Sequence, residues 1–171
     1  NYTIYDTISI NSSFGQNLWL GIQTETEGSA YLSNNNTYYS LISNQEWLII
    51  SKLNSVEQSA YFQEKYVKTI KKTPIIFFKM YLIKLKNFWF FRNNIGTEYS
   101  STIKRYLPIY FIGYSMILLL TLTYFYKDRK ISMILLGLPL GLSLFQAFFY
   151  VETRHRIIIE PLLIFMAICS V

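Results

Sequence analysis

After Arg105 the chain becomes almost wholly apolar, and this change constrains the fold more than any other feature. Three apolar stretches follow, separated by short charged turns: residues 106–126, 131–151 and 157–171. A 21-residue helix, the length of either of the first two stretches, is about 31 Å long and matches a hydrocarbon core of about 30 Å. The sequence therefore predicts an all-α integral membrane protein with a hairpin of two spanning helices and a truncated third span.

Residues 1–73 are polar and predict a surface loop region that contains one helix. The helix is expected from Ser55 to Lys72. An S-x-x-Q pattern at Ser55 and Gln58 is typical of a capping box at its start. Thr73 precedes Pro74, a pair that ends one helix and suits the first turn of the next.

Residues 74–105 predict an amphipathic helix, from Pro74 to about Phe91, and a linker. Three lysines interrupt its apolar sequence: Lys79, Lys84 and Lys86. Each of them would cost about 2.5–3.5 kcal/mol at the centre of a spanning helix. We therefore expect this helix to lie in the membrane interface, where the lysine side chains reach water. A tilted or re-entrant span is the alternative.

The net charge of +6 favours contact with anionic lipid head groups, because the sequence has no nucleic-acid-binding signature. Residues 127–130 hold three basic side chains in four positions, which indicates a cytoplasmic turn. Residues 1–105 and the turn at 152–156 are then extracytoplasmic, in a bacterial inner membrane. The lone Cys169 excludes an intrachain disulfide, and no metal-binding cluster is present in the sequence.

The turn between the second and third apolar stretches gathers five polar residues: Glu152, Arg154, His155, Arg156 and Glu160. If the third helix begins near Arg154, Arg156 and Glu160 lie one turn apart on one face. Ionisable groups at membrane depth mark functional sites, and a guanidinium can hold two phosphate oxygens. A bound anion would also explain two arginines on the outer side. The alternative is a salt-bridge cluster that only ends two helices.

Several motifs in this chain, taken in order, resemble one family: besides the two described next, the Thr73–Pro74 break, the helix with spaced lysines and the pair Phe88–Trp89 are similar in order and spacing. The run Arg154–Ile164, R-H-R-I-I-I-E-P-L-L-I, resembles the closing segment of bacterial GT-C membrane glycosyltransferases, the relatives of protein mannosyltransferases and of the lipid A aminoarabinose transferase. The stretch Gly15–Gly21, G-Q-N-L-W-L-G, is similar to the G-x-N-L-W-x-G stretch of their extracytoplasmic loop. The resemblance covers nearly the whole chain, but only the C-terminal part of the family. His155 and Ile158 depart from it, since tyrosine and proline are usual there.

The resemblance implies a transferase that moves a sugar from a polyprenyl-phosphate carrier to a glycan, lipid or protein outside the membrane. It implies that Arg154 and Arg156 hold the departing lipid phosphate, with His155 assisting. It assigns Glu152 and Glu160 supporting roles only. The lipid-linked sugar is a substrate, and no cofactor is expected.

The resemblance also implies that Asn17 and Trp19 shape the sugar or acceptor side of the site. Simple loop packing is the alternative for both residues. The family's catalytic carboxylate lies near its N-terminus, and nothing in these residues corresponds to it. We therefore expect a C-terminal fragment that is inactive alone. A transporter or flippase fragment and a non-catalytic membrane scaffold are the rival interpretations.

Overall fold

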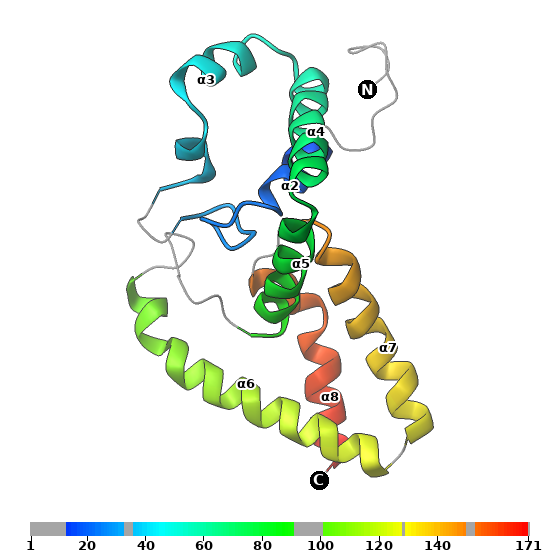
Figure 1. Ribbon diagram of the computed structural model, residues 1–171. Coiled ribbons are helices and arrows are strands. Elements are labelled where there is room, and N and C mark those ends of the chain that lie inside the picture. Colours follow the sequence, from blue (N-terminus) through cyan, green and yellow to red (C-terminus); the bar gives the residue numbers. More distant parts are fainter. Residues whose placement is uncertain (1–12, 33–35, 91–100, 128, 150–152, 171) are drawn as a thin grey trace.

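The computed structural model describes residues 13–32, 36–90, 101–127, 129–149 and 153–170. The regular elements in these ranges are helices, and the ranges contain no named strand, in agreement with the predicted all-α class. Three of the helices form one elongated group at the lower end of Figure 1, and the polar first part of the chain lies at the other end.

The polar region contains more helices than the sequence predicted. Helix α2 (Phe14–Leu20), a 3₁₀ turn η1 (Tyr38–Leu41) and helix α3 (Asn44–Ile50) precede α4 (Ser55–Lys72). The prediction of a single helix in residues 1–73 is therefore wrong. Helices α2 and α3 have only seven residues each, which is too short for an apolar period to be read from the sequence.

Helix α4 has the predicted bounds but a different cap. The side chain of Asn54, not of Ser55, accepts hydrogen bonds from the backbone of Val56 and Glu57. The Glu57 carboxylate in turn accepts from the Asn54 backbone, which completes a capping box one residue earlier than expected. The helix is amphipathic, and its Phe62 side chain is buried against α2.

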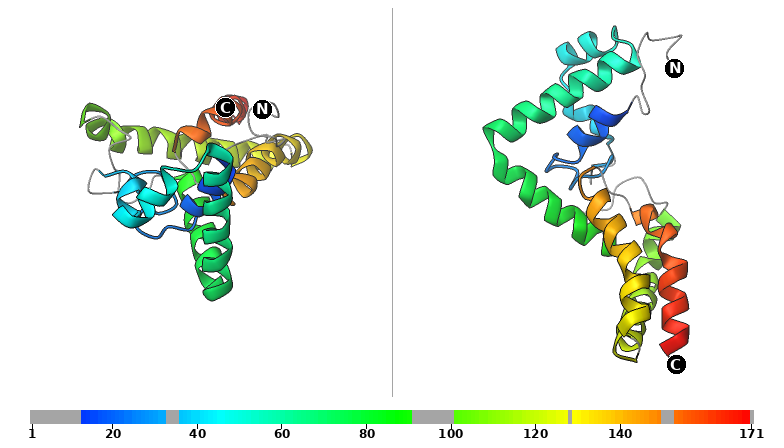
Figure 2. Two further views of the ribbon diagram at one scale, coloured as in Figure 1. Left: turned by 90° about the horizontal axis from the view of Figure 1, so that it is seen from above. Right: turned by 90° about the vertical axis from the view of Figure 1, so that its right-hand side faces the viewer.

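Helix α5 (Pro74–Trp89) begins at the proline that the sequence singled out. It continues from α4 after a sharp bend at Thr73, which the right-hand view of Figure 2 shows clearly. Proline is suited to the first helical position, because its missing N–H would have no intrahelical partner there. The bend directs α5 from the polar region toward the apolar helices.

The apolar part consists of α6 (Ser101–Lys127), α7 (Arg129–Gln146), a 3₁₀ segment η2 (Thr153–Ile158) and α8 (Glu160–Ser170). Among the described residues only α6 is long and apolar enough to cross a membrane, over the 24 residues Lys104–Lys127. The expectation of a second complete span over 131–151 is therefore not met.

The ends of α7 and α8 explain this difference. Helix α7 has 18 residues, about 27 Å, and from Phe148 on the backbone hydrogen bonds span only three residues. Helix α8 begins at Glu160 instead of Ile157, with Pro161 in its first turn. The 3₁₀ segment η2 occupies the positions where the sequence predicted the first turn of the third span.

Helices α6 and α8 run side by side in the same direction. The Tyr110 hydroxyl donates to the Glu160 carboxylate at one end of the pair, and Lys127 Nζ lies 3.3 Å from the Cys169 carbonyl oxygen at the other. A hydrophobic core lies at the first of these ends and contains Phe88, Tyr114, Ile159 and Leu163. Segment η2 therefore lies at the end nearer the polar region, opposite the 127–129 turn (Figure 1).

Candidate functional site

Arg156 is one of the two arginines of the predicted anion site, and it is fully buried. Segment η2 places its guanidinium against the end of α5, where Nη1 donates to the Trp89 carbonyl oxygen at 3.1 Å. The guanidinium carbon lies 4.4 Å from the centre of the Tyr114 ring on α6, a cation–π contact. Arg156 thus joins three elements that are distant in the sequence.

Glu160 completes this cluster from the first residue of α8. Its Oε1 lies 3.7 Å from Arg156 Nε, so the predicted i,i+4 pair is present even though the α-helix starts only at Glu160. The same oxygen accepts the hydrogen bond from the Tyr110 hydroxyl. The rings of Tyr110 and Tyr114 are nearly parallel, with centroids 6.2 Å apart. The four side chains form one connected polar group between α6 and α8.

The other predicted members of the anion site differ in what can be said of them. His155 is half-buried in η2. The backbone of Arg154 lies in η2, whereas its side chain and the whole of Glu152 lie outside the described residues. Arg156 is fully buried, so its guanidinium is not open to an anion at the surface in this arrangement. Among the predicted members of the anion site whose side chains are described, His155 is partly exposed.

Sequence reasoning misassigned Lys84. Lys79 and Lys86 are exposed as expected, but Lys84 is only 1% exposed, so the expectation that all three lysines reach water is wrong for this one. Burial lowers the pKa of Lys84 from 10.5 to about 7. No hydrogen bond or ion pair joins its amine to another described residue. The sequence offered one sign of this burial: Lys84 lies off the helix face that Lys79 and Lys86 share.

Two glycines make room for Lys84. A Cβ atom on Gly21 would lie 2.8 Å from Lys84 Nζ and 2.7 Å from the Phe149 carbonyl oxygen. A Cβ atom on Gly28, whose φ of +75° favours glycine, would lie 2.7 Å from Lys84 Cγ. The segment that follows α2 therefore packs closely against the Lys84 side chain of α5, and against the backbone of Phe149 just after α7.

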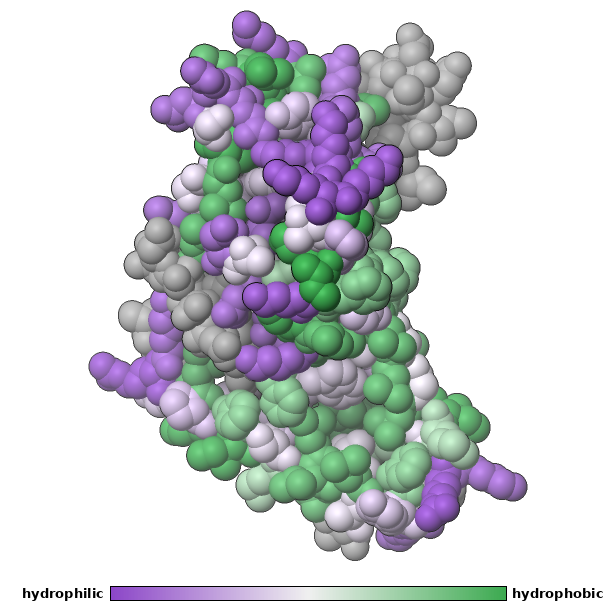
Figure 3. All heavy atoms as spheres, viewed as in Figure 1, coloured by the Kyte–Doolittle hydropathy of each residue, from purple (hydrophilic) through white to green (hydrophobic). Residues whose placement is uncertain are grey.

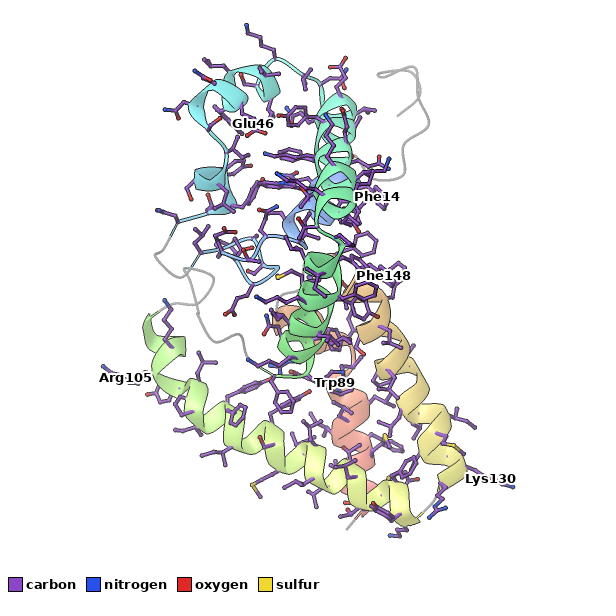
Figure 4. The ribbon with its side chains drawn as sticks, in the orientation of Figure 1. Phe14, Glu46, Trp89, Arg105, Lys130 and Phe148 are labelled. Atoms are coloured by element: carbon purple, nitrogen blue, oxygen red, sulfur yellow. The ribbon has the colours of Figure 1, made fainter. Side chains whose placement is uncertain are left out.

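The G-x-N-L-W-x-G stretch is explained by close contacts at both of its ends. At the first end, a Cβ atom on Gly15 would lie 1.8 Å from the Ser59 carbonyl oxygen of α4, and the Gly15 N–H donates to Ser59 Oγ at 2.9 Å. At the second end, Gly21 lies against Lys84 as described. The neighbouring Phe14 ring contacts the Phe149 ring with centroids 5.8 Å apart, and Figure 4 labels Phe14 beside α4.

The two residues predicted for the sugar or acceptor side lie on α2. Trp19 is buried in the core of the polar region, with its ring centroid 5.0 Å from that of Phe62 and Lys65 Nζ 4.9 Å from the indole. Asn17 is half-buried on the same short helix. The structure therefore gives Trp19 a packing environment and leaves Asn17 nearer the surface.

Two cavities flank the end of α5. The first, of about 230 Å³, lies between α6 and α8, and its wall includes Tyr110, Tyr114 and Glu160. The second, of about 420 Å³, lies between α5 and α7, and its wall includes Lys86, Trp89 and Ser143. Both are mainly apolar. In the part of the chain that the structure describes, no three His, Cys, Asp or Glu side chains are grouped to hold a metal ion.

Comparison with known protein families, with characterised proteins and with solved structures gave no match. The resemblance to GT-C glycosyltransferases therefore rests on the motifs in the sequence. What the structure adds is their arrangement: the G-x-N-L-W-x-G stretch, the lysine-bearing α5 and the R-H-R turn meet at one end of the apolar helices.

Proposed function

We propose that this chain is part of a membrane glycosyltransferase that takes a sugar from a polyprenyl-phosphate carrier and passes it to an extracytoplasmic glycan, lipid or protein. The observation that carries the proposal is the convergence of three motif segments. Gly21 contacts Lys84 and Phe149, and Arg156 binds the end of α5 at Trp89. A donor carried by a membrane lipid would need its site at such a junction of polar region and apolar helices.

The membrane setting is supported by the surface of α6. Large apolar side chains are exposed along it, among them Ile109, Ile112, Met116 and Leu119. Figure 3 shows apolar surface over the lower part of the molecule and hydrophilic surface above it. Arg105 and Lys130, labelled in Figure 4, lie near opposite ends of this region. We infer that α6 spans the inner membrane, with residues 1–105 outside and the 127–130 turn inside.

Within this proposal the residues of η2 have different roles. We assign to His155 and Arg154 the stabilisation of the negative charge that grows on the carrier phosphate as the sugar leaves. Arg156 is a positioning residue, because its guanidinium is held by Trp89, Tyr114 and Glu160. The group that activates the acceptor is not assigned to any residue of this chain.

The test measures the transfer of radiolabelled sugar from its polyprenyl-phosphate carrier. It uses native membranes that contain the full-length protein. Arg154→Ala and His155→Ala should each lower kcat/KM for the donor about tenfold or more, since one charged hydrogen bond contributes about 1.5–3 kcal/mol. Arg105→Ala is the matched control, because Arg105 is an exposed arginine in the first part of α6, the end of that helix nearer η2. Unchanged transfer in both η2 variants, with normal membrane insertion, would contradict the phosphate site.

A non-catalytic membrane scaffold is a second candidate, favoured by the inward position of Arg156. A guanidinium that is fully buried against Trp89 and Glu160 suits a purely structural role, in which a salt bridge ends two helices. In that case the protein would show no sugar transfer with any carrier. Arg156→Ala would then lower the stability of the α5–α6–α8 junction as its sole effect.

A further inference from the structure

The cavity between α6 and α8 has apolar walls and one polar end. Its walls are formed by Gly113, Ile117, Leu163 and Ile164, together with the rings of two tyrosines. Its polar residue is Glu160, whose carboxylate accepts a hydrogen bond from the Tyr110 hydroxyl. A cavity of this kind suits an amphiphile with an apolar body and one small polar group.

The polar end accepts hydrogen bonds but carries little net charge. Glu160 Oε1 accepts from the Tyr110 hydroxyl and lies 3.7 Å from Arg156 Nε. No hydrogen bond joins its second oxygen, Oε2, to another described residue, and 25% of the side chain is exposed. The Glu160 carboxylate would repel an anion, and its pairing with the guanidinium of Arg156 weakens its attraction for a cation. A neutral hydroxyl, by contrast, can donate to Glu160 Oε2.

The wall also has unused space. A Cβ atom on Gly113 would meet no heavy atom within 4 Å. An apolar chain can therefore approach the α6 backbone at this position more closely than it could approach any larger residue. Since Ile112 and Met116, near Gly113 on α6, are exposed and face lipid in the proposed membrane setting, the natural source of such a chain is a membrane lipid.

We propose that the α6–α8 cavity binds a neutral lipid alcohol. Its hydroxyl donates to Glu160, and its chain lies along Gly113, Ile117 and Leu163. This site rests on the proposed membrane placement of α6, but not on sugar transfer. It differs from the proposed carrier-phosphate site, which is assigned to Arg154 and His155 of η2.

The proposal can be tested by photolabelling. The protein is reconstituted in vesicles of phosphatidylcholine and phosphatidylglycerol that contain a diazirine-bearing hexadecanol, and labelled residues are located by mass spectrometry. We expect label on α6 and α8 around the cavity wall. Unlabelled hexadecanol should compete for it, whereas palmitate should not and hexadecylamine should compete more weakly than hexadecanol. Equal competition by all three amphiphiles would overturn the proposal.

Two glycine variants make a matched pair. Gly113→Leu fills the open space in the wall and should lower cavity labelling about tenfold, the loss expected for about 1.4 kcal/mol of binding free energy. Gly137→Leu, on α7, also enters open space but does not line this cavity, and it should leave labelling unchanged. Equal labelling of the two variants would refute the site.

A diazirine-bearing phosphatidylcholine separates this proposal from the membrane placement on which it rests. Label from this lipid along the exposed face of α6, without hexadecanol label in the cavity, refutes the alcohol site alone. No label on α6 from either probe refutes both the site and the membrane setting.

Discussion

Replacing Lys84 by Met should stabilise the protein at neutral pH, although it removes a charge from the helix expected to lie in the membrane interface. The lysine stem is packed between Gly21 and Gly28, and methionine can keep most of that packing. What it removes is the cost of an amine that is 1% exposed. In the folded chain, burial lowers the pKa of this amine from 10.5 to about 7.

The magnitude follows from the two pKa values. The difference corresponds to about 5 kcal/mol between the charged and the neutral amine. The folded pKa of Lys84 is below the unfolded one, so between pH 7 and 10.5 the unfolded chain binds more protons, and folding stability rises with pH by about 1.4 kcal/mol per pH unit. Below pH 7 the full cost is present and stops changing. At pH 7 itself the Met variant should be more stable by about 4 kcal/mol.

The measurement is thermal unfolding in detergent micelles between pH 6 and pH 10. The difference in free energy of unfolding between Lys84→Met and the unmodified chain should be largest below pH 7 and should shrink steadily above it. Lys79→Met is the matched control, because Lys79 is an exposed lysine on the same helix. A Met variant that is less stable than the unmodified chain at pH 7, or a difference that does not change with pH, would refute the burial of a lysine here.

Three further outcomes are expected. Gly15→Ala should destabilise the α2–α4 contact by about 1–3 kcal/mol, because its Cβ would meet backbone of α4, and Trp19 fluorescence during unfolding would detect this; an unchanged midpoint would contradict that contact. Asn54→Ala should cost about 1 kcal/mol through loss of the α4 cap, measured by circular dichroism, unless Ser55 provides the cap as the sequence suggested. Burial alone would raise the pKa of Glu46, but hydrogen bonds from Lys65 and Tyr61 hold it below its usual value, so this group's contribution to stability is lost as the pH falls through the folded pKa. Lys65→Met should raise that pKa in an NMR titration, and an unmoved pKa would argue against the ion pair.

The sequence predicted those elements whose signals are local. A proline at position 74 marked the α4–α5 boundary, and a long uninterrupted apolar run marked α6. The ion pair between Arg156 and Glu160 followed from their spacing. Each of these features depends on residues within a few turns of one another.

Features that depend on contacts between distant segments were missed. The burial of Lys84 is created by Gly21 and Gly28, which lie on a segment more than fifty positions earlier in the chain. The inward turn of Arg156 depends on the Trp89 carbonyl oxygen and the Tyr114 ring. No period or motif reports such partners, because they come together only when the helices pack.

The membrane crossing of α6 is the claim on which both proposals depend, and cysteine accessibility tests it most directly. On a Cys169→Ser background, Ser40→Cys and Lys130→Cys each introduce one exposed thiol, in the polar region and at the 127–130 turn. In spheroplasts, whose cytoplasmic membrane is intact and accessible, a membrane-impermeant maleimide should label the thiol at position 40. The thiol at position 130 should be labelled only after permeabilisation. Labelling of both thiols from the same side would contradict a membrane-spanning α6.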